Sequence, residues 1–309
     1  MHVFNPLKNS LDLGPLSFQF YAIAIMTGIL TALWLAYREV KKLRENPDDL
    51  SDGFTWGLVY GILGARMYYV LYEWQSYASD PIRAFYIWEG GLAIHGTILA
   101  VSVFLYFYTK KRNLNIFHYI EVLVPGFILA QAIGRWGNFF NQEAHGGMID
   151  GATLDIKRSF LESTLHLPKF IVDQMYLWGP DGLSYYHPTF FYEFAWNMTG
   201  FIVMFFILRR IRKYWIGDAL SFYLVWYSFG RFFIEGMRTD SLYVWNTDIR
   251  MAQLISVVLI IVGLAWFAFR RYKKIYAVSY KEYVYETIQE TVQETPKDIK
   301  EVGDSNEQV

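Results

Sequence analysis

Seven stretches of the chain are long and apolar enough to cross a membrane, and this feature limits the possible folds more than any other. The hydrocarbon core of a bilayer is ~30 Å thick and takes about 20 helical residues. Inside it every backbone N–H and C=O must be paired within the protein, so spans of this length are helices. We expect an all-α integral membrane protein with seven transmembrane helices. These helices are expected near residues 17–37, 51–72, 91–108, 117–138, 189–208, 216–235 and 251–269.

The composition agrees with a membrane protein. Hydrophobic residues form 54% of the chain and charged residues 18%, below the roughly 25% of soluble domains. The chain has no cysteine, which excludes thiol catalysis, disulfides and Cys-ligated metals. We expect no metal and no cofactor, and the net charge of −1 gives no basic field for nucleic acid. The first residues lack the flanks of a cleavable signal peptide, so the first apolar segment is expected to remain as a span.

Lysine and arginine set the expected orientation, because cytoplasmic loops are enriched in both. The loops after the first, third, fifth and seventh spans carry them in clusters, whereas the other loops carry them thinly over more chain. The clusters are Arg38, Lys41, Lys42, Arg44, Lys110, Lys111, Arg112, Arg209, Arg210, Arg212, Lys213, Arg270, Arg271, Lys273 and Lys274. We expect the N-terminus outside and the C-terminus in the cytoplasm.

Two segments lie outside the spans. Residues 139–187 contain Gly, Asp, Pro and short apolar pieces, and they are long enough for a small cap on the outer face between the fourth and fifth helices. Such a cap could guide or screen a substrate, and an inert surface loop is the open alternative. Residues 275–309 are acidic and polar, which predicts a solvated, disordered cytoplasmic tail after a membrane domain of residues 1–274.

Polar residues interrupt the apolar spans, and the expected topology puts all of them in the outer half of the membrane. Odd-numbered spans begin at the outer face and even-numbered spans end there. The residues concerned are Tyr21, Arg66, His95, Arg135, Asn138, His187, Arg231 and Glu235. An arginine at the centre of a span costs roughly 2.5–3.5 kcal/mol, and such residues usually face a polar cavity or an anionic partner. The convergence predicts a functional site near the outer face.

Helical spacing groups the charged residues further. Arg135 and Asn138 are three residues apart and share a helix face. Arg231, Glu235 and Arg238 follow one another at spacings of four and three, so they also share a face. Glu235 is therefore placed to orient either neighbouring arginine, because a carboxylate accepts two guanidinium hydrogen bonds.

The arginines expected at one depth need more anionic compensation than the carboxylates of Glu89, Glu143 and Glu235 supply. A planar guanidinium matches phosphate oxygens in a bidentate manner. The abundant phosphate at the outer leaflet is a phospholipid head group, so we expect a membrane lipid to bind here. His95 stands among glycines that allow close approach of a ligand, and its imidazole is a suitable base for a group such as a thiol.

Several of these residues also have a purely structural interpretation. Tyr21 fits an aromatic belt at the membrane interface, where Tyr is enriched. His187 fits the start of a helix, with Glu193 as its polar partner, as well as it fits catalysis. Arg66 fits an ion pair between spans, and Arg238 fits an exposed loop charge.

A thirteen-residue run carries a resemblance to a known family. Residues 134–146 read Gly-Arg-Trp-Gly-Asn-Phe-Phe-Asn-Gln-Glu-Ala-His-Gly, which resembles the signature of bacterial phosphatidylglycerol–prolipoprotein diacylglyceryl transferases. Supporting segments on both sides of this run lie in the family's order between about residues 10 and 270. They are Gly14-Pro15 with Tyr21, Gly64-Ala65-Arg66, Glu89-Gly90-Gly91 with His95-Gly96, His187-Pro188-Thr189 with Tyr192-Glu193, and Gly230-Arg231-Phe232-Phe233-Ile234-Glu235-Gly236-Met237-Arg238. Thr97 and Phe190 depart from the pattern without touching the expected chemistry.

The resemblance implies an enzyme of the bacterial cytoplasmic (inner) membrane. Its implied reaction transfers the sn-1,2-diacylglyceryl group of phosphatidylglycerol to the lipobox cysteine thiol of a prolipoprotein signal peptide. Glycerol phosphate is released, and a thioether forms, as the first step of lipoprotein maturation. The reacting cysteine belongs to the substrate, so a chain without cysteine is compatible with this reaction.

For this reaction we assign roles to the site residues as a hypothesis. Arg135 and Arg231 would hold the lipid phosphate, with Asn138 donating a further hydrogen bond. His95 would remove or relay the thiol proton, and Tyr21 would orient the head group or the thiol. The remaining expected substrate-binding residues are Arg66, Glu143, Gly146, His187, Glu235 and Arg238. Among these, the two glutamates would position the arginines and the glycine would permit a tight turn.

Two other classes of protein remain open. A secondary transporter for an anionic solute also gathers arginines and a histidine, but near the midplane and in repeated, broken helices. A membrane scaffold or receptor with buried ion pairs needs no lipid groove. An intramembrane serine protease is disfavoured, because Ser102, Ser221 and Ser228 lack a Gly-x-Ser-x-Gly setting.

Overall fold

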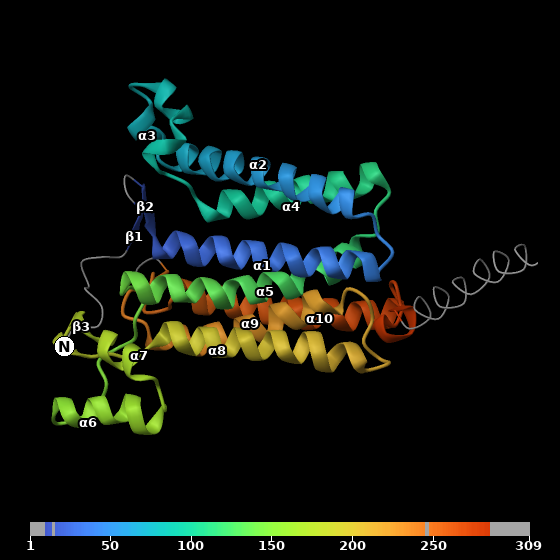
Figure 1. Ribbon diagram of the computed structural model, residues 1–309. Helices are drawn as coiled ribbons and strands as arrows, with labels where there is room; N and C mark the ends of the chain where they lie inside the picture. The colour runs from blue at the N-terminus through green and yellow to red at the C-terminus, as the bar shows by residue number, and fades with distance from the viewer. Residues whose placement is uncertain (1–9, 14–15, 245–246, 285–309) are drawn as a thin grey trace, which may run out of the picture. The chain divides into compact units, whose positions relative to one another are not determined.

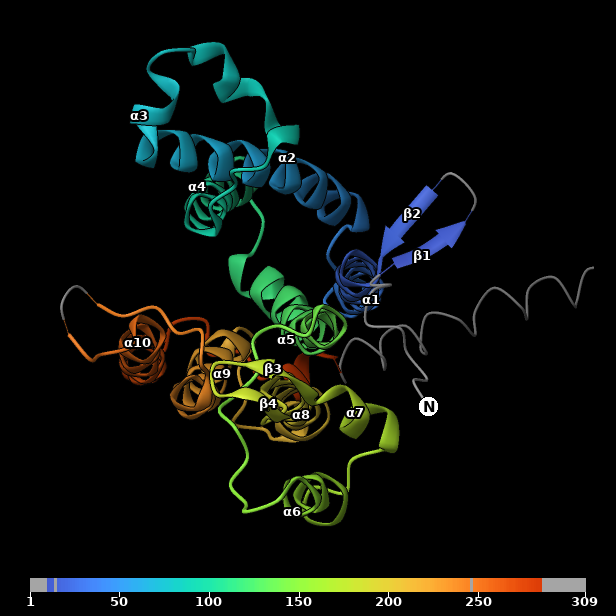
Figure 2. The ribbon, with the colours of Figure 1, turned by 90° about the vertical axis from the view of Figure 1, so that its left-hand side faces the viewer.

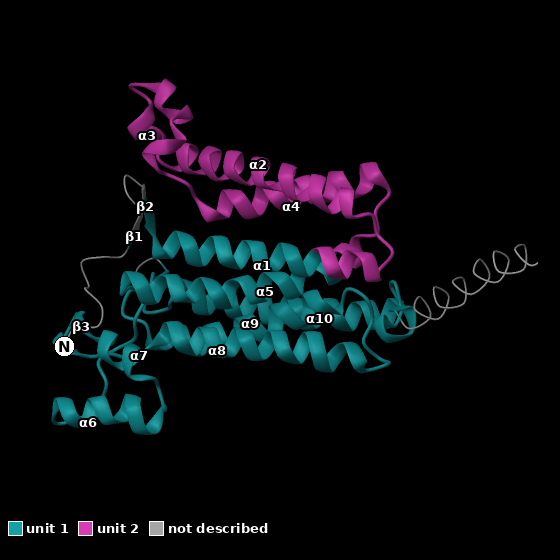
Figure 3. Cartoon of the chain, viewed as in Figure 1, with its two compact units in different colours: residues 1–36, 120–309 teal, residues 37–119 magenta. Residues whose placement is uncertain are grey.

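The computed structural model describes residues 10–13, 16–244 and 247–284 and divides into two compact units (Figure 3). Unit 1 comprises residues 1–36 and 120–309, and unit 2 comprises residues 37–119. The chain passes between them within two long helices, α1 (Phe20–Lys42) and α5 (Ile116–Asn141). Of the candidate site residues, Arg66 and His95 belong to unit 2 and the others to unit 1.

The long helices of unit 1 run alongside one another (Figures 1 and 2). They are the first part of α1, most of α5, α8 (Thr189–Ile202), α9 (Asp218–Met237) and α10 (Met251–Lys273). A π-helical turn η4 (Val203–Ile207) and a 3₁₀ turn η5 (Leu208–Arg210) continue α8. An antiparallel hairpin of β1 (Ser10–Leu13) and β2 (Leu16–Gln19) precedes α1.

Close contacts of aromatic rings and glycines join these helices. The rings of Trp196 on α8 and Trp226 on α9 stack at 4.5 Å, and each indole N–H donates to the other residue's carbonyl. Helices α1 and α5 touch at Gly28 and Gly126, where an added Cβ would lie 3.0 Å from a carbonyl oxygen of the other helix. The interior of a lipid bilayer is as apolar as the side chains of the helices. Close backbone approach and hydrogen bonding are therefore what hold helices together there.

Unit 2 is a pair of packed helices joined by a loop. Helix α2 (Pro47–Tyr72) begins at the cap residue Asn46, whose side chain accepts from the backbone N–H of Asp48. The short turns α3 (Trp74–Tyr77), η1 (Pro81–Phe85) and η2 (Ile87–Glu89) lead to α4 (Ile94–Arg112). Helices α2 and α4 meet backbone to backbone at Gly64 and Gly96, because a Cβ on either would overlap the carbonyl of the other.

Within the described residues, four helices are long and apolar enough to cross a membrane. They are Phe20–Lys42, Ile116–Asn141, Thr189–Arg210 and Met251–Lys273. Helices α2, α4 and α9 overlap the other three expected spans, 51–72, 91–108 and 216–235, but they are less apolar. The chain is therefore mostly helical with several membrane-spanning candidates, and seven crossings remain a prediction.

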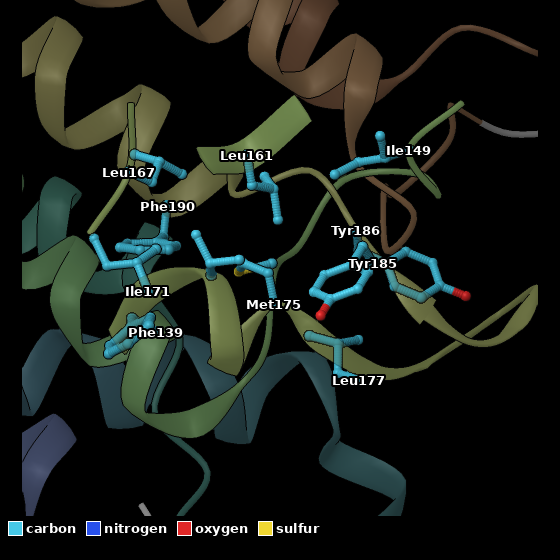
Figure 4. Packing of buried hydrophobic residues seen from close by; sticks show 11 residues of the cluster. Phe139, Ile149, Leu161, Leu167, Ile171, Met175, Leu177, Tyr185, Tyr186 and Phe190 are labelled. Atoms are coloured by element: carbon cyan, nitrogen blue, oxygen red, sulfur yellow. The ribbon is translucent and has the colours of Figure 1, made fainter. Parts of the chain in front are cut away.

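The segment between α5 and α8 is a folded element with its own core rather than an irregular loop (Figure 4). It contains α6 (Leu154–Ser159), the π-helical turn η3 (Phe160–Thr164), α7 (Lys169–Gln174) and a hairpin of β3 (Tyr176–Gly179) and β4 (Gly182–Tyr185). Leu161, Val172 and Tyr186 are 0% exposed in this core, which also includes Phe139 of α5 and Phe190 of α8. The two helices thereby anchor the insertion to unit 1.

The far end of unit 1 from this insertion holds a second set of buried charges. Glu121 accepts from Arg209 Nε at 2.8 Å, from the Tyr214 hydroxyl at 3.0 Å and from the Gly217 N–H at 3.0 Å. Nearby, Asp218 accepts from Arg270 Nη1 at 2.8 Å, and Arg271 also pairs with Asp218. Several of the basic residues expected in cytoplasmic loops are therefore partnered here.

A short strap from the chain after α10 lies on these buried charges; we define the strap as residues 275–284. Ile216 N donates to Val278 O at 2.9 Å and Tyr280 N to Tyr214 O at 3.0 Å, which forms a bridge to the loop before α9. The Arg209 guanidinium lies 4.5 Å from the centre of the Tyr280 ring. The predicted solvated tail thus starts with packed residues, and its part from 285 to 309 lies outside the described residues.

Candidate functional site

One carboxylate joins two arginines from different helices. Glu193, in the first turns of α8, pairs through one oxygen with Arg135 of α5 and through the other with Arg231 of α9. Glu193 is 4% exposed, and the side chains of the arginines are 21% and 17% exposed. Burial without partners would be costly for each charge, so the three residues compensate one another. This arrangement concentrates guanidinium groups at one end of the unit 1 helices.

A second carboxylate extends the cluster along α9. Glu235 lies 2.5 Å from Arg231 Nη2 and 3.9 Å from Arg238 Nε, at the spacings of four and three residues that the sequence predicts. Arg238 also holds Asp240 at 2.7 Å. Burial alone would raise the pKa of Asp240, but the hydrogen bond and positive charge of Arg238 outweigh it and lower the pKa. Arg238 is therefore a partnered side chain with 13% exposure rather than an exposed loop charge.

The end of α5 connects Arg135 to the start of the insertion. Arg135 Nη1 donates to Asn138 Oδ1 at 3.4 Å, and Asn138 Nδ2 donates to Glu143 Oε1 at 3.0 Å. Glu143 thus acts on Arg135 through Asn138, whereas the sequence predicted a direct role in positioning the arginine. The carboxylate that contacts Arg135 is Glu193, which the sequence suggested only as a partner of His187. A glutamate inside an apolar helix was the available signal, because such a charge needs a partner there.

Gly146 lies where three parts of the chain converge. Its N–H donates to His187 O at 2.9 Å, and it forms a bridge with Arg238 just after α9. A Cβ at this position would lie 2.7 Å from the His187 Cβ and 3.1 Å from Thr189 Cγ2. We expected this glycine to permit a tight turn, but the structure shows that it permits close packing of three segments.

Tyr21 and His187 both lie at the same end of unit 1 as the arginines. Tyr21, in the first turn of α1, packs on α5 so closely that a Cβ on Gly137 would lie 2.6 Å from its ring. His187 Nδ1 lies 3.1 Å from the Tyr192 hydroxyl, so its polar partner is Tyr192 and not Glu193. Burial lowers the pKa of His187, and the charge of Asp150 opposes this only in part, which favours the neutral imidazole.

The two candidates of unit 2 differ from each other in exposure. His95 is the second residue of α4, is exposed, and has its ring centre 5.9 Å from that of Tyr68. Arg66 is 5% exposed and donates to backbone carbonyls of the loop between α3 and α4. Its partners favour a structural role over the predicted substrate contact, and they are carbonyls rather than the carboxylate of an ion pair.

The described part of the chain contains no group of three or more His, Asp or Glu side chains that could hold a metal ion. The arginines at the ends of α5 and α9 lie among carboxylate and amide side chains. Guanidinium groups clustered in this way are suited to binding a phosphate or carboxylate ligand.

Comparison with known proteins gives a family and close relatives. The family model described as "Prolipoprotein diacylglyceryl transferase" matches residues 8–269. A Staphylococcus xylosus protein named "Phosphatidylglycerol--prolipoprotein diacylglyceryl transferase" is 44% identical over 262 residues, covering 85% of this chain and 88% of the relative. A Staphylococcus aureus (strain Newman) protein of the same name is 42% identical over 272 residues, covering 88% of this chain and 92% of the relative.

Proposed function

The chain belongs to the prolipoprotein diacylglyceryl transferase family, and from this premise we propose that the arginines joined by Glu193 form its catalytic site. The enzyme transfers the diacylglyceryl group of phosphatidylglycerol to a prolipoprotein thiol and releases glycerol phosphate. We take the acceptor to be the lipobox cysteine of the signal peptide. The observation that carries the assignment is the pairing of Arg135 and Arg231 with one buried carboxylate.

The reaction explains why two arginines are needed. The sulfur forms a bond to the glyceryl carbon, the carbon–oxygen bond to phosphate breaks, and the electron pair leaves with glycerol phosphate. Negative charge therefore grows on the phosphate as the reaction proceeds. Arginines aimed at this charge stabilise the transition state more than the ground state. Each guanidinium has five N–H donors, so Arg135 and Arg231 can bind a phosphate while they remain paired with Glu193.

The other site residues support this anion site. Asn138 donates a hydrogen bond to the head group, and Glu143 holds the Asn138 amide in place. Glu235 pairs with both Arg231 and Arg238, and it orients Arg231 for the phosphate. Tyr21, His187 and Gly146 shape the same end of unit 1, where the head group or the thiol is held.

His95 is proposed as the base that takes the thiol proton, because neutral imidazole is suited to this task near neutral pH. The variant His95→Gln removes the base and keeps a side chain of similar size. We expect it to lower the rate of transfer and to change its dependence on pH. Substantial transfer with an unchanged pH profile would remove His95 from the proton path.

The membrane arrangement belongs to the same proposal. Seven helices cross the bacterial cytoplasmic membrane, with the N-terminus outside and the C-terminus in the cytoplasm. The insertion at residues 139–187 then lies on the outer face and caps the site. Both substrates are available there, because phosphatidylglycerol belongs to the leaflet and the lipobox follows the signal peptide helix. The folded core of the insertion supports a cap more than an inert loop.

The proposal is tested with purified protein in detergent, phosphatidylglycerol and a lipobox peptide, followed by mass spectrometry of the peptide. We expect a mass gain of one diacylglyceryl unit, which Arg135→Ala abolishes. Arg135→Lys keeps the charge and loses the bidentate geometry, so it should be strongly impaired; normal turnover would contradict the role of the guanidinium. No mass gain from folded wild-type protein with both substrates present would refute the proposed reaction.

A further inference from the structure

Arg66 uses every N–H of its guanidinium on the backbone of one loop. Nε donates to Ala84 O at 2.8 Å, Nη1 to the carbonyls of Gly90 at 2.5 Å and Gly91 at 3.1 Å, and Nη2 to those of Arg83 at 2.7 Å and Tyr86 at 3.2 Å. Since arginine has five N–H donors, this set of bonds is complete. All five acceptors lie between α3 and α4 in unit 2.

Three of the five carbonyls, those of Ala84, Gly90 and Gly91, have no backbone donor among the described hydrogen bonds, whereas those of Arg83 and Tyr86 also accept from the N–H groups of Tyr86 and Glu89. The 3₁₀ turns η1 and η2 are short, and the carbonyl of Ala84 near the end of η1 is one that the turn itself does not pair. Gly90 and Gly91 follow with φ of +84° and +73°, a conformation that favours glycine. This path turns both of their carbonyls to the same nitrogen of Arg66. The guanidinium therefore supplies the donor that these three carbonyls lack and a second donor to the other two.

Among the described residues, no carboxylate contacts Arg66. Glu89 is instead paired with Arg83 at 3.0 Å, and both of these side chains are substantially exposed. The charge of Arg66 is balanced by carbonyl dipoles, and its Cζ lies 5.3 Å from the centre of the Tyr77 ring. A phosphate bound to Arg66 would have to displace these carbonyls, and those of Ala84, Gly90 and Gly91 would then lose their donor, which is costly for a buried group.

The loop ends two residues before His95. Ala93 N donates to Ala65 O at 3.1 Å, next to Arg66, and Gly96 is held against Gly64 of α2. His95 therefore stands between two points at which the start of α4 is fastened to α2. The bonds of Arg66 fix the rest of the loop to the same helix, so they determine where α4 begins.

We propose that Arg66 is a positioning residue that holds the loop of residues 83–93 on α2 and thereby sets the position of His95. This inference rests on the proposed role of His95 in the reaction. It separates Arg66 from Arg135 and Arg231, which are assigned to the phosphate. Arg66 acts on the reaction only through the backbone of the loop.

The variant Arg66→Lys tests the proposal, because an ammonium group has three N–H donors and cannot satisfy five carbonyls. We expect kcat to fall at least tenfold while KM for phosphatidylglycerol changes less than twofold. Hydrogen exchange of the amides in residues 83–93 should become faster by at least tenfold. A phosphate ligand would give the opposite pattern, with a raised KM and unchanged exchange in the loop.

Two further variants in the same loop make the test specific. Gly91→Ala places a Cβ 2.7 Å from Arg66 Nη1 and 2.6 Å from the Tyr69 ring, so it should reproduce the loss of kcat and the faster exchange. Arg83→Gln removes an equal charge, but its side chain forms an exposed ion pair and should behave like wild type.

The outcomes separate this inference from the role of His95. Unchanged exchange in Arg66→Lys would overturn the idea that Arg66 holds the loop. Faster exchange with full activity would show that the loop does not position a group needed for the reaction, and it would overturn the positioning role. Normal activity of His95→Gln would refute the base, and with it the idea that Arg66 acts on the reaction through His95, even if exchange in the loop of Arg66→Lys became faster.

Discussion

At the scale of single residues, the arginine cluster of the candidate site depends on one carboxylate that two arginines share. Glu193 contacts both Arg135 and Arg231, so one side chain fixes the separation of two cations from different helices. Without it, the guanidinium groups would repel each other in a partly buried setting. Because the charges are held in place before the reaction, the cluster can stabilise the transition state without having to rearrange.

The variant Glu193→Gln should disrupt this arrangement while it keeps the size of the side chain. Breaking a buried ion pair from one side costs about 3 kcal/mol or more, and we expect kcat/KM to fall by roughly 100-fold. Steady-state transfer and thermal unfolding in detergent measure the two effects. The matched control is Glu89→Gln, whose exposed pair with Arg83 contributes little. Equal behaviour of the two variants would contradict the bridging role.

Sequence patterns located most of these residues but not their partners. Spacing along one helix predicted the contact of Glu235 with Arg231, because both belong to α9. The contact of Glu193 with Arg135 joins α8 to α5, and no pattern within one helix reveals which helices will be neighbours. The partners of Arg66 were harder still to predict, because they are backbone carbonyls, which every residue carries.

At the scale of elements, the insertion between α5 and α8 combines a small core with anchors on both helices. Its buried residues form one hydrophobic cluster with Phe139 at the end of α5 and Phe190 at the start of α8. The same two helix ends carry Asn138 and Glu193. Packing in the insertion therefore supports the positions of site residues that it does not itself contain. The composition of residues 139–187 predicted the size of this element, but its core depends on contacts that only the fold defines.

Leu161→Ala should weaken this element. The side chain is 0% exposed, and truncation of a buried leucine to alanine costs about 2–5 kcal/mol. We expect faster hydrogen exchange across residues 149–186 and a smaller, secondary loss of transfer activity. Leu154→Ala, at a position that is 45% exposed, serves as the control and should have almost no effect. Similar exchange in both variants would show that the core is not a cooperative unit.

At the scale of the whole molecule, hydropathy predicted the positions of the long helices well. Each expected span overlaps a helix of the structure, since burying about 20 apolar residues in lipid leaves little alternative. The division into two units was not predictable, because both boundaries fall inside the helices α1 and α5. The strap was also missed, since acidic and polar composition favours a solvated tail and gives no sign of the few backbone bonds that hold it.

The strap lies beyond the residues that the family model matches, which end at 269. A chain that stops after Lys274 loses the backbone bonds to Tyr214 and Ile216 and the ring over Arg209. We expect its unfolding temperature in detergent to drop by roughly 5 °C or more. A chain that stops after Val284 keeps these bonds and should unfold at a higher temperature than the chain that stops after Lys274. If both truncations unfolded at the same temperature as wild type, the strap would have no part in stability.

The bridge formed by Glu193 has a consequence for the order of synthesis. If α5, α8 and α9 enter the bilayer as proposed, each brings in a charge whose partner stands on another of these helices. Arg135 is made first, and an unpaired arginine in lipid is unfavourable by roughly 2.5–3.5 kcal/mol. It is therefore favourable for helix α5 to stay with the insertion machinery until α8 is made and Glu193 can pair with Arg135. The free energy falls again when α9 follows and Arg231 pairs with Glu193. The order of these charges along the chain thus determines the order in which the helices can leave the insertion machinery.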